Sequence, residues 1–192
     1  MKLGKIILAM AAASVLLGML VGTASARNLS ASAQAITVTW ARFDLRANFG
    51  TVECEVTVEG SFHERTIAKT SGSLTGYVTG ARVSPRCRRG EATVLTETLP
   101  WHVQYDNFTG TLPTITSIRA RVIGLAFRSG LFGISCLSRS ALAEPATITF
   151  NREAGGVISS ATAGGAIRTT CGDVGTLSGT SNSLSSLRVT LI

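Results

Sequence analysis

The chain has 192 residues, of which 45% are hydrophobic and 15% are charged, and its formal net charge is +7. Globular domains average about 25% charged residues, whereas disordered chains combine high charge with few apolar residues. The composition therefore excludes a disordered chain and favours a folded protein with a hydrophobic core.

The N-terminal segment has the three parts of an export signal. Lys2 and Lys5 supply positive charge, residues 6–21 form an uncharged and largely apolar run, and Ala24 and Ala26 are small residues spaced as a signal peptidase requires. These features predict a signal peptide over residues 1–26, cleaved after Ala26, and a single secreted β-rich domain over residues 27–192. An uncleaved anchor is the alternative, because the apolar run falls just short of a membrane span.

The basic residues of the predicted mature chain are nearly all arginine. Loss of Lys2 and Lys5 lowers the net charge from +7 to +5, and Lys69 is then the only lysine left. Such a bias is typical of GC-rich bacterial genomes, so it predicts a bacterial source. The residual positive charge also favours an anionic partner.

The strand predictions, in chain order, begin at residues 36–42 and continue with the clearest case, residues 51–59. There Val52, Cys54, Val56 and Val58 alternate with polar residues, which places them on one buried face. The further predicted strands are residues 73–79, 92–98, 99–105, 118–127, 134–137, 146–150 and 187–191, separated by turn signals such as Gly60, Ser71-Gly72, Gly110 and Ser129-Gly130. Residues 159–186, rich in Gly, Ser, Thr and Ala, predict loops and short strands of the same domain.

About nine to ten strands at these spacings predict an all-β fold, an antiparallel β-sandwich of the Ig-like or jelly-roll-like kind. Four cysteines, Cys54, Cys87, Cys136 and Cys171, remain after the leader, and an even number in an exported domain predicts two disulfides. Three connectivities are open, and we expect the sequential one, Cys54–Cys87 with Cys136–Cys171. A zinc site is the rival interpretation, but the chain has no Cys-x-x-Cys pair, so no metal is expected.

No nucleophile, phosphate-binding or metalloenzyme motif occurs, so we expect neither catalytic residues nor a cofactor. The best carboxylate pair is Glu53 and Glu55, which on one strand face stand about 6.5–7 Å apart, within the range of inverting glycosidases. A small glycan-active hydrolase using this pair is therefore an alternative. The competing interpretation is a solvated strand face whose charges discourage edge pairing.

Residues 81–90 contain four arginines around Cys87: Arg82, Arg86, Arg88 and Arg89. Guanidinium groups bind phosphate, sulfate and carboxylate with paired hydrogen bonds, so this loop is a candidate anion-binding site. A second candidate lies in residues 101–108, the densest aromatic stretch. Trp101 and Tyr105 alternate as core residues do, which leaves Asn107 and Phe108 as the candidate surface recognition pair.

These observations predict an exported β-sandwich that acts as a binding or structural module at the bacterial cell surface or in the medium. Its expected partner is an anionic or carbohydrate polymer of the cell envelope, or another surface protein. We expect no nucleic acid, because no aromatic residues interleave with the arginines, and contact with the membrane only through the signal segment before cleavage. Besides the hydrolase, an outer-membrane β-barrel is an alternative, since it too has alternating strands and an N-terminal signal.

Overall fold

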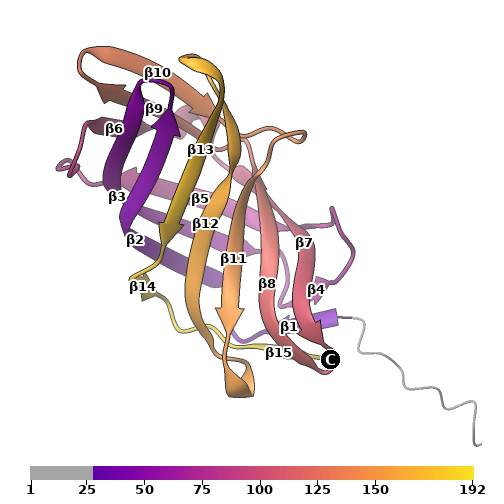
Figure 1. Cartoon of the computed structure of the whole chain (residues 1–192). Coiled ribbons are helices and arrows are strands. Elements are labelled where there is room, and N and C mark those ends of the chain that lie inside the picture. Colours follow the sequence, from indigo (N-terminus) through magenta and orange to yellow (C-terminus); the bar gives the residue numbers. More distant parts are fainter. Residues whose placement is uncertain (1–27) are drawn as a thin grey trace, which may run out of the picture.

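The computed structural model describes residues 28–192, so the predicted signal peptide at residues 1–26 lies outside the described residues. Within them the chain forms fifteen strands and two short 3-10 helices, with no α-helix (Figure 1). Ten strands have six residues or more, and five have two to four. None of the helices in this part of the chain is long and apolar enough to cross a membrane.

The long strands are β2 (Ala35–Ala47), β3 (Gly50–Phe62), β5 (Leu74–Val83), β7 (Trp101–Thr111), β8 (Thr114–Ile123), β9 (Ala126–Leu131), β10 (Ile134–Arg139), β11 (Ala146–Arg152), β12 (Ile158–Thr169) and β13 (Gly172–Thr180). The short strands are β1 (Asn28–Ala31), β4 (Thr66–Ala68), β6 (Glu91–Val94), β14 (Ser183–Leu184) and β15 (Val189–Leu191). The 3-10 helices are η1 (Thr96–Thr98) and η2 (Ala154–Gly156).

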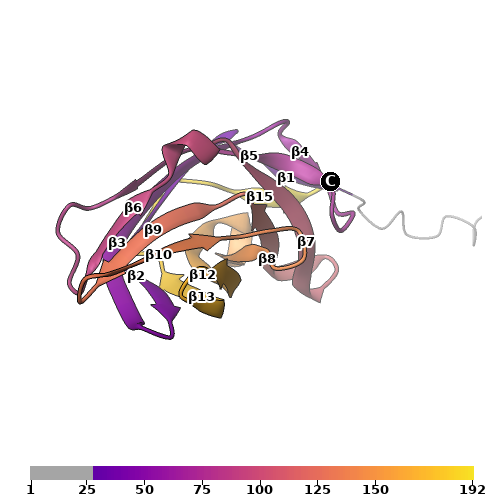
Figure 2. The same cartoon turned by 90° about the horizontal axis from the view of Figure 1, so that it is seen from above.

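The main sheet pairs its strands in the order β11-β8-β7-β5-β3-β2-β13-β12-β10-β9-β6, and β11 also pairs with β12. Every pairing is antiparallel, and β11 has β8 as its neighbour on one side and β12 on the other. Strands β11, β12 and β13 thereby face β3 and β5 across a common interior, as the two layers of a sandwich do (Figures 1 and 2). The predicted all-β, antiparallel, sandwich-like fold with two disulfides is confirmed.

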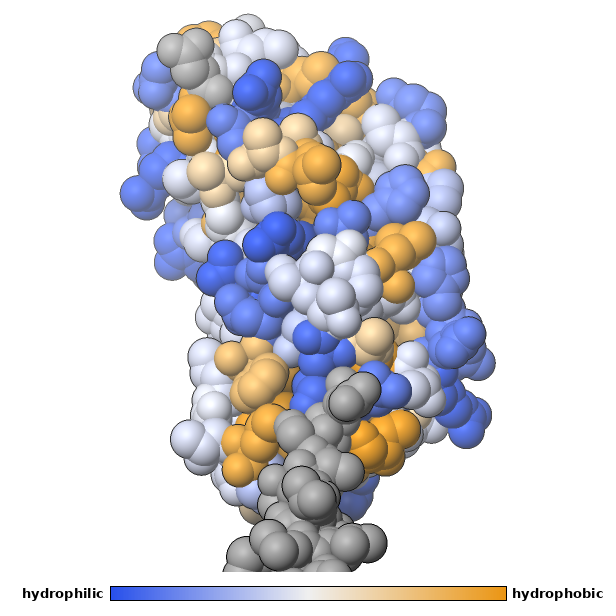
Figure 3. Space-filling view, turned by 90° about the vertical axis from the view of Figure 1, so that its right-hand side faces the viewer, coloured by the Kyte–Doolittle hydropathy of each residue, from blue (hydrophilic) through white to orange (hydrophobic). Residues whose placement is uncertain are grey.

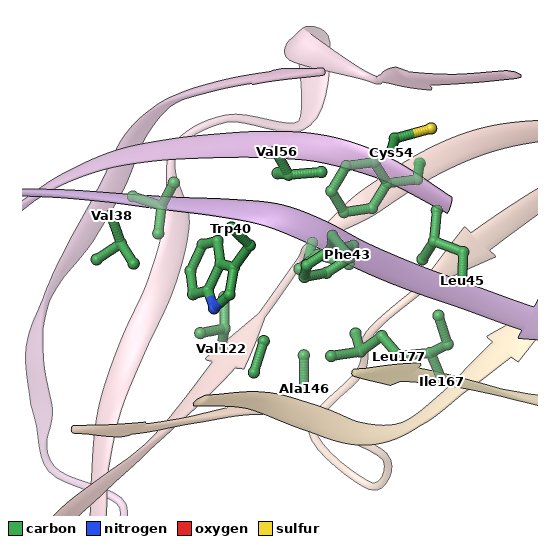
Figure 4. Close-up of a cluster of buried hydrophobic side chains, with 14 of the residues drawn as sticks. Val38, Trp40, Phe43, Leu45, Cys54, Val56, Val122, Ala146, Ile167 and Leu177 are labelled. Atoms are coloured by element: carbon green, nitrogen blue, oxygen red, sulfur yellow. The ribbon is translucent and has the colours of Figure 1, made fainter. Parts of the chain in front are cut away.

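The interior of the sandwich holds the larger of two hydrophobic clusters (Figure 4). Trp101 and Phe127 are fully buried there, and the indole of Trp40 donates a hydrogen bond of 3.0 Å to the carbonyl oxygen of Ala161 on β12. The alternation predicted for residues 51–59 holds as far as Val56, with Cys54 on the inward face. Beyond it the prediction is wrong, because Thr57 is buried and Val58 is only half-buried. On the face in Figure 3, hydrophobic residues form only small separate groups among polar ones.

A second, three-stranded sheet, β15-β1-β4, covers one end of the sandwich. Its central strand pairs Leu29 with Leu191 on one side and with Ile67 on the other. Leu29 and Ile67 are buried, and they belong to the second hydrophobic cluster together with Tyr105, Ile115, Ile118, Ile158, Leu187 and Val189. This sheet therefore closes the end of the interior with apolar side chains.

Three strand predictions are wrong, and glycine explains two of them. Residues 92–98 are a strand only as far as Val94, where β6 ends, and Thr96–Thr98 form η1. Residues 118–127 form not one strand but the end of β8 and the start of β9, because Gly124 adopts a left-handed backbone (φ 89°) between them. Residues 159–186 contain the long strands β12 and β13 rather than loops and short strands. A Cβ atom at Gly165 would lie 2.9 Å from the carbonyl oxygen of Pro145, and one at Gly175 would lie 2.7 Å from that of Arg46. The small residues thus allow close backbone approach.

Candidate functional site

Two disulfides brace the molecule, and they have the predicted sequential connectivity. Cys54 on β3 is bonded to Cys87 in the loop between β5 and β6, and Cys136 on β10 is bonded to Cys171 in the turn between β12 and β13. Among the described residues there is no free cysteine. Disulfides persist in oxidising compartments, which indicates a non-cytoplasmic environment for this protein.

The loop of residues 84–90, which we call the basic loop, is fixed to strand β3 by its backbone as well as by the Cys54–Cys87 bond. The carbonyl oxygen of Glu53 accepts hydrogen bonds from the backbone nitrogens of Arg88 (2.8 Å) and Arg89 (3.3 Å). In return, the backbone nitrogen of Glu53 donates to the carbonyl oxygen of Arg89 at 2.9 Å. The backbone that carries these arginines is therefore held in place without their side chains.

Of the four arginines predicted as an anion site, one lies on a strand and three lie in the basic loop. Arg82 lies on β5, and its guanidinium forms an ion pair of 2.6 Å with Glu59. Arg86, Arg88 and Arg89 lie in the basic loop with exposed side chains, and none of them makes an ion pair within residues 28–192. The loop thus presents three unneutralised guanidinium groups to solvent.

A turn with exposed apolar side chains lies at the same end of the molecule as the basic loop. We call residues 132–134 the apolar turn, and the sequence analysis did not predict it. The basic loop leads into β6, whose first residue, Glu91, pairs with Gly130 on β9, and β9 turns into β10 through Phe132 and Gly133. Phe132 is 83% exposed and Ile134 is 49% exposed. Phe132 also has a left-handed backbone (φ 53°), which is unfavourable for a bulky residue. An aromatic ring is thereby held in solvent beside the basic loop.

The turn predicted at Ser129-Gly130 is wrong, and this explains why the apolar turn was missed. Both residues are buried inside β9, where Ser129 pairs with Cys136 on β10. The actual turn comes at Phe132-Gly133, where a two-residue hairpin normally has Asn-Gly or Asp-Gly. Of the two residues that signal such a turn, the sequence has only the Gly at the second position.

The carboxylate pair of the hydrolase alternative lies on the outer face of β3. The carboxylate of Glu53 forms an ion pair of 3.2 Å with the guanidinium of Arg42. The same guanidinium forms an ion pair of 3.1 Å with the carboxylate of Asp44. The hydrogen bond to Asp44 and the charges of both carboxylates raise the pKa of Arg42. Glu55 is exposed. Neither Glu53 nor Glu55 lines the apolar cavities inside the sandwich.

The two residues of the predicted recognition pair, Asn107 and Phe108, have different surroundings on β7. Asn107 is exposed on β7, whereas Phe108 packs against the second hydrophobic cluster and lies 5.6 Å from the ammonium of Lys69. Between Tyr105 and Asn107 the strand has an irregular register, and there the Asp106 carboxylate is buried in ion pairs with two arginines of β8. Phe108 is therefore a packing residue, and only Asn107 faces solvent.

Both histidines of the chain pack against one tyrosine. The rings of His63 and His102 lie 4.6 Å and 5.3 Å from the ring of Tyr77, in edge-on contacts. Across residues 28–192, no three His, Cys, Asp or Glu side chains come close enough together to hold a metal ion. No protein-family model, curated protein or solved structure matches this chain.

Proposed function

We propose that this protein is an exported binding module of the bacterial cell surface, and that its basic loop holds an anionic carbohydrate polymer of the envelope. The observation that carries the proposal is the set of three exposed, unpaired guanidinium groups of Arg86, Arg88 and Arg89 on a disulfide-anchored loop. A fixed backbone lowers the entropy that is lost when the loop binds, and guanidinium groups match phosphate, sulfate and carboxylate oxygens.

The apolar turn supports a carbohydrate as the carrier of the anionic groups. Phe132 is 83% exposed in a strained backbone conformation, and strain retained at an exposed position is a common mark of a functional contact. An exposed aromatic ring stacks on the C–H face of a sugar, while the adjacent arginines bind its charged substituents. The nearby acidic residues, Glu55 and Glu91, reduce the local positive charge only in part.

The export signal and the disulfides support the location. Residues 1–26 have the pattern of a cleavable signal, and disulfides require the oxidising conditions found outside the cytoplasm. The envelope and its surroundings are rich in phosphorylated and uronic-acid polymers. A basic surface is therefore expected to meet anionic carbohydrate there.

The test compares dextran sulfate with neutral dextran as probes, because the two differ only in charge. The mature protein should bind dextran sulfate with an affinity that falls as salt rises, and it should bind neutral dextran far more weakly. Replacement of Arg86, Arg88 and Arg89 together by alanine should lower the affinity for dextran sulfate about tenfold, given the modest energy of each exposed charge pair. Phe132→Ala should weaken binding further without changing its salt dependence.

A matched control separates the basic loop from net charge alone. Arg65, Arg139 and Arg188 are also exposed, but they lie outside the basic loop. Their joint replacement by alanine removes the same charge and should leave binding within about twofold of the wild type. Equal losses in the two triple variants, or no binding of dextran sulfate by the wild type, would refute the proposal.

A further inference from the structure

An apolar cavity lies where the two hydrophobic clusters meet, at the end of the sandwich that the three-stranded sheet covers. Its volume is about 70 Å³. A single buried water needs roughly 10–15 Å³, so the cavity has room for a small molecule of a few non-hydrogen atoms. The lining comes from β2, β3, β4, β5, β7, β8, β11, β12 and β15, and it includes Val38, Phe62, Val103, Ile118, Ile148 and Phe150. Almost every lining side chain is apolar, and none of them carries a charge.

One polar group in this lining has no partner. Tyr105 on β7 is 3% exposed and lines the cavity, and its hydroxyl is the buried side-chain oxygen that lacks a hydrogen bond within residues 28–192. Buried hydroxyls in folded proteins are nearly always hydrogen-bonded, so an orphaned one needs a physical reason. A group supplied by a bound molecule is such a reason.

The groups around Tyr105 leave its hydroxyl free to donate. Burial, and to a lesser degree the neighbouring Asp106 carboxylate, raise the pKa of Tyr105, so the phenol stays protonated near neutral pH. The Asp106 carboxylate is occupied by its ion pairs with Arg119 and Arg121. Thr75, a polar residue in the same lining, already donates to the carbonyl oxygen of Val103 at 3.0 Å.

We propose that this cavity binds a small uncharged molecule, with a short apolar body in the cavity and a single carbonyl, ester or hydroxyl group that accepts a hydrogen bond from Tyr105 Oη. The apolar lining recognises the body by removing it from water. A charged head is disfavoured, because no lining side chain carries a compensating charge and burial of a lone ion is costly. This site is separate from the basic loop, and it assigns a role to the orphaned hydroxyl.

The test titrates the mature protein with butanone, butane and butyrate, probes with the same number of carbons that differ in the head. Calorimetry should show the tightest binding for the ketone, weaker binding for butane and the weakest for butyrate. Tyr105→Phe should weaken ketone binding roughly three- to tenfold, the contribution of one net hydrogen bond, and should leave butane binding unchanged.

A second variant keeps the proposal falsifiable if the first disturbs folding. Ala120 lines the cavity, and its backbone pairs with that of Tyr105 across β7 and β8, so Ala120→Leu fills part of the cavity. It should abolish binding of both the ketone and butane. Equal affinity for the ketone and butane in the wild type, unchanged ketone binding in Tyr105→Phe, or no binding of either probe would overturn the proposal.

Discussion

Replacement of Tyr105 by phenylalanine should make the ligand-free protein more stable, which is unusual for a change in a core. The ring of Tyr105 packs in the second hydrophobic cluster and stays buried in the variant. What is lost is a hydroxyl without a partner, and an unsatisfied buried polar group costs about 1–3 kcal/mol. The space left by one oxygen costs little in comparison, about 0.2 kcal/mol for roughly 10 Å³ of new cavity.

The net expectation is a rise of about 1 kcal/mol in the free energy of unfolding, or roughly 2–4 °C in the melting temperature of a domain of this size. Urea denaturation of the ligand-free protein measures it, with the fluorescence of the buried Trp40 and Trp101 as the signal. Tyr77→Phe is the matched control, because Tyr77 is only half-buried and packs between two histidines, so its replacement should change stability little. A Tyr105→Phe variant less stable than the wild type would refute the reasoning, since the hydroxyl would then have a partner such as a buried water.

Two further predictions concern the same fold. Joint replacement of Cys54 and Cys87 by serine removes a disulfide that closes a loop with a sequence separation of 33. Because the disulfide restricts the unfolded chain, its loss should lower the free energy of unfolding by about 3–4 kcal/mol, as measured by guanidinium denaturation. A loss below about 1 kcal/mol would contradict this explanation. The raised pKa of Tyr105 favours its protonated form in the folded state. Ionisation of Tyr105 therefore leaves stability unchanged below the ordinary value of 10.0, and stability falls as pH rises from that value through the higher folded pKa. Unfolding measured on both sides of that value should show a shallower decline for Tyr105→Phe than for wild type, and identical slopes would contradict the assignment.

Much of the local structure could be predicted because it depends on residues near one another in the chain. Val52, Cys54 and Val56 alternate with polar residues, and a strand places alternate side chains on opposite faces. The inward direction of Cys54 and the burial of Trp101 follow from that rule alone. The predictions failed where local composition misleads. The many small residues of β12 and β13 led to a prediction of loops and short strands. Their lack of bulk is instead what lets neighbouring backbones approach.

The candidate sites were predictable only in part, because each joins segments far apart in the chain. Four arginines in residues 81–90 are visible in the sequence, but the pairing of β3 with β5 decides that Arg82 meets Glu59 while the other three stay unpaired. The proximity of the basic loop to Phe132 depends on the pairing of β6 with β9. No local pattern encodes these registers.

The sequence by itself determined the all-β class, the disulfide count, the export pattern and which faces of the strands are apolar, since these follow from residue type and from a period of two. The tertiary structure alone decided which strands pair, how the ends of the described chain form a cover over the sandwich, and that Tyr105 borders a cavity with its hydroxyl unpaired. A tyrosine in an alternating strand looks like any core residue. Whether its hydroxyl finds a partner depends on side chains that strand pairing brings in from distant parts of the chain.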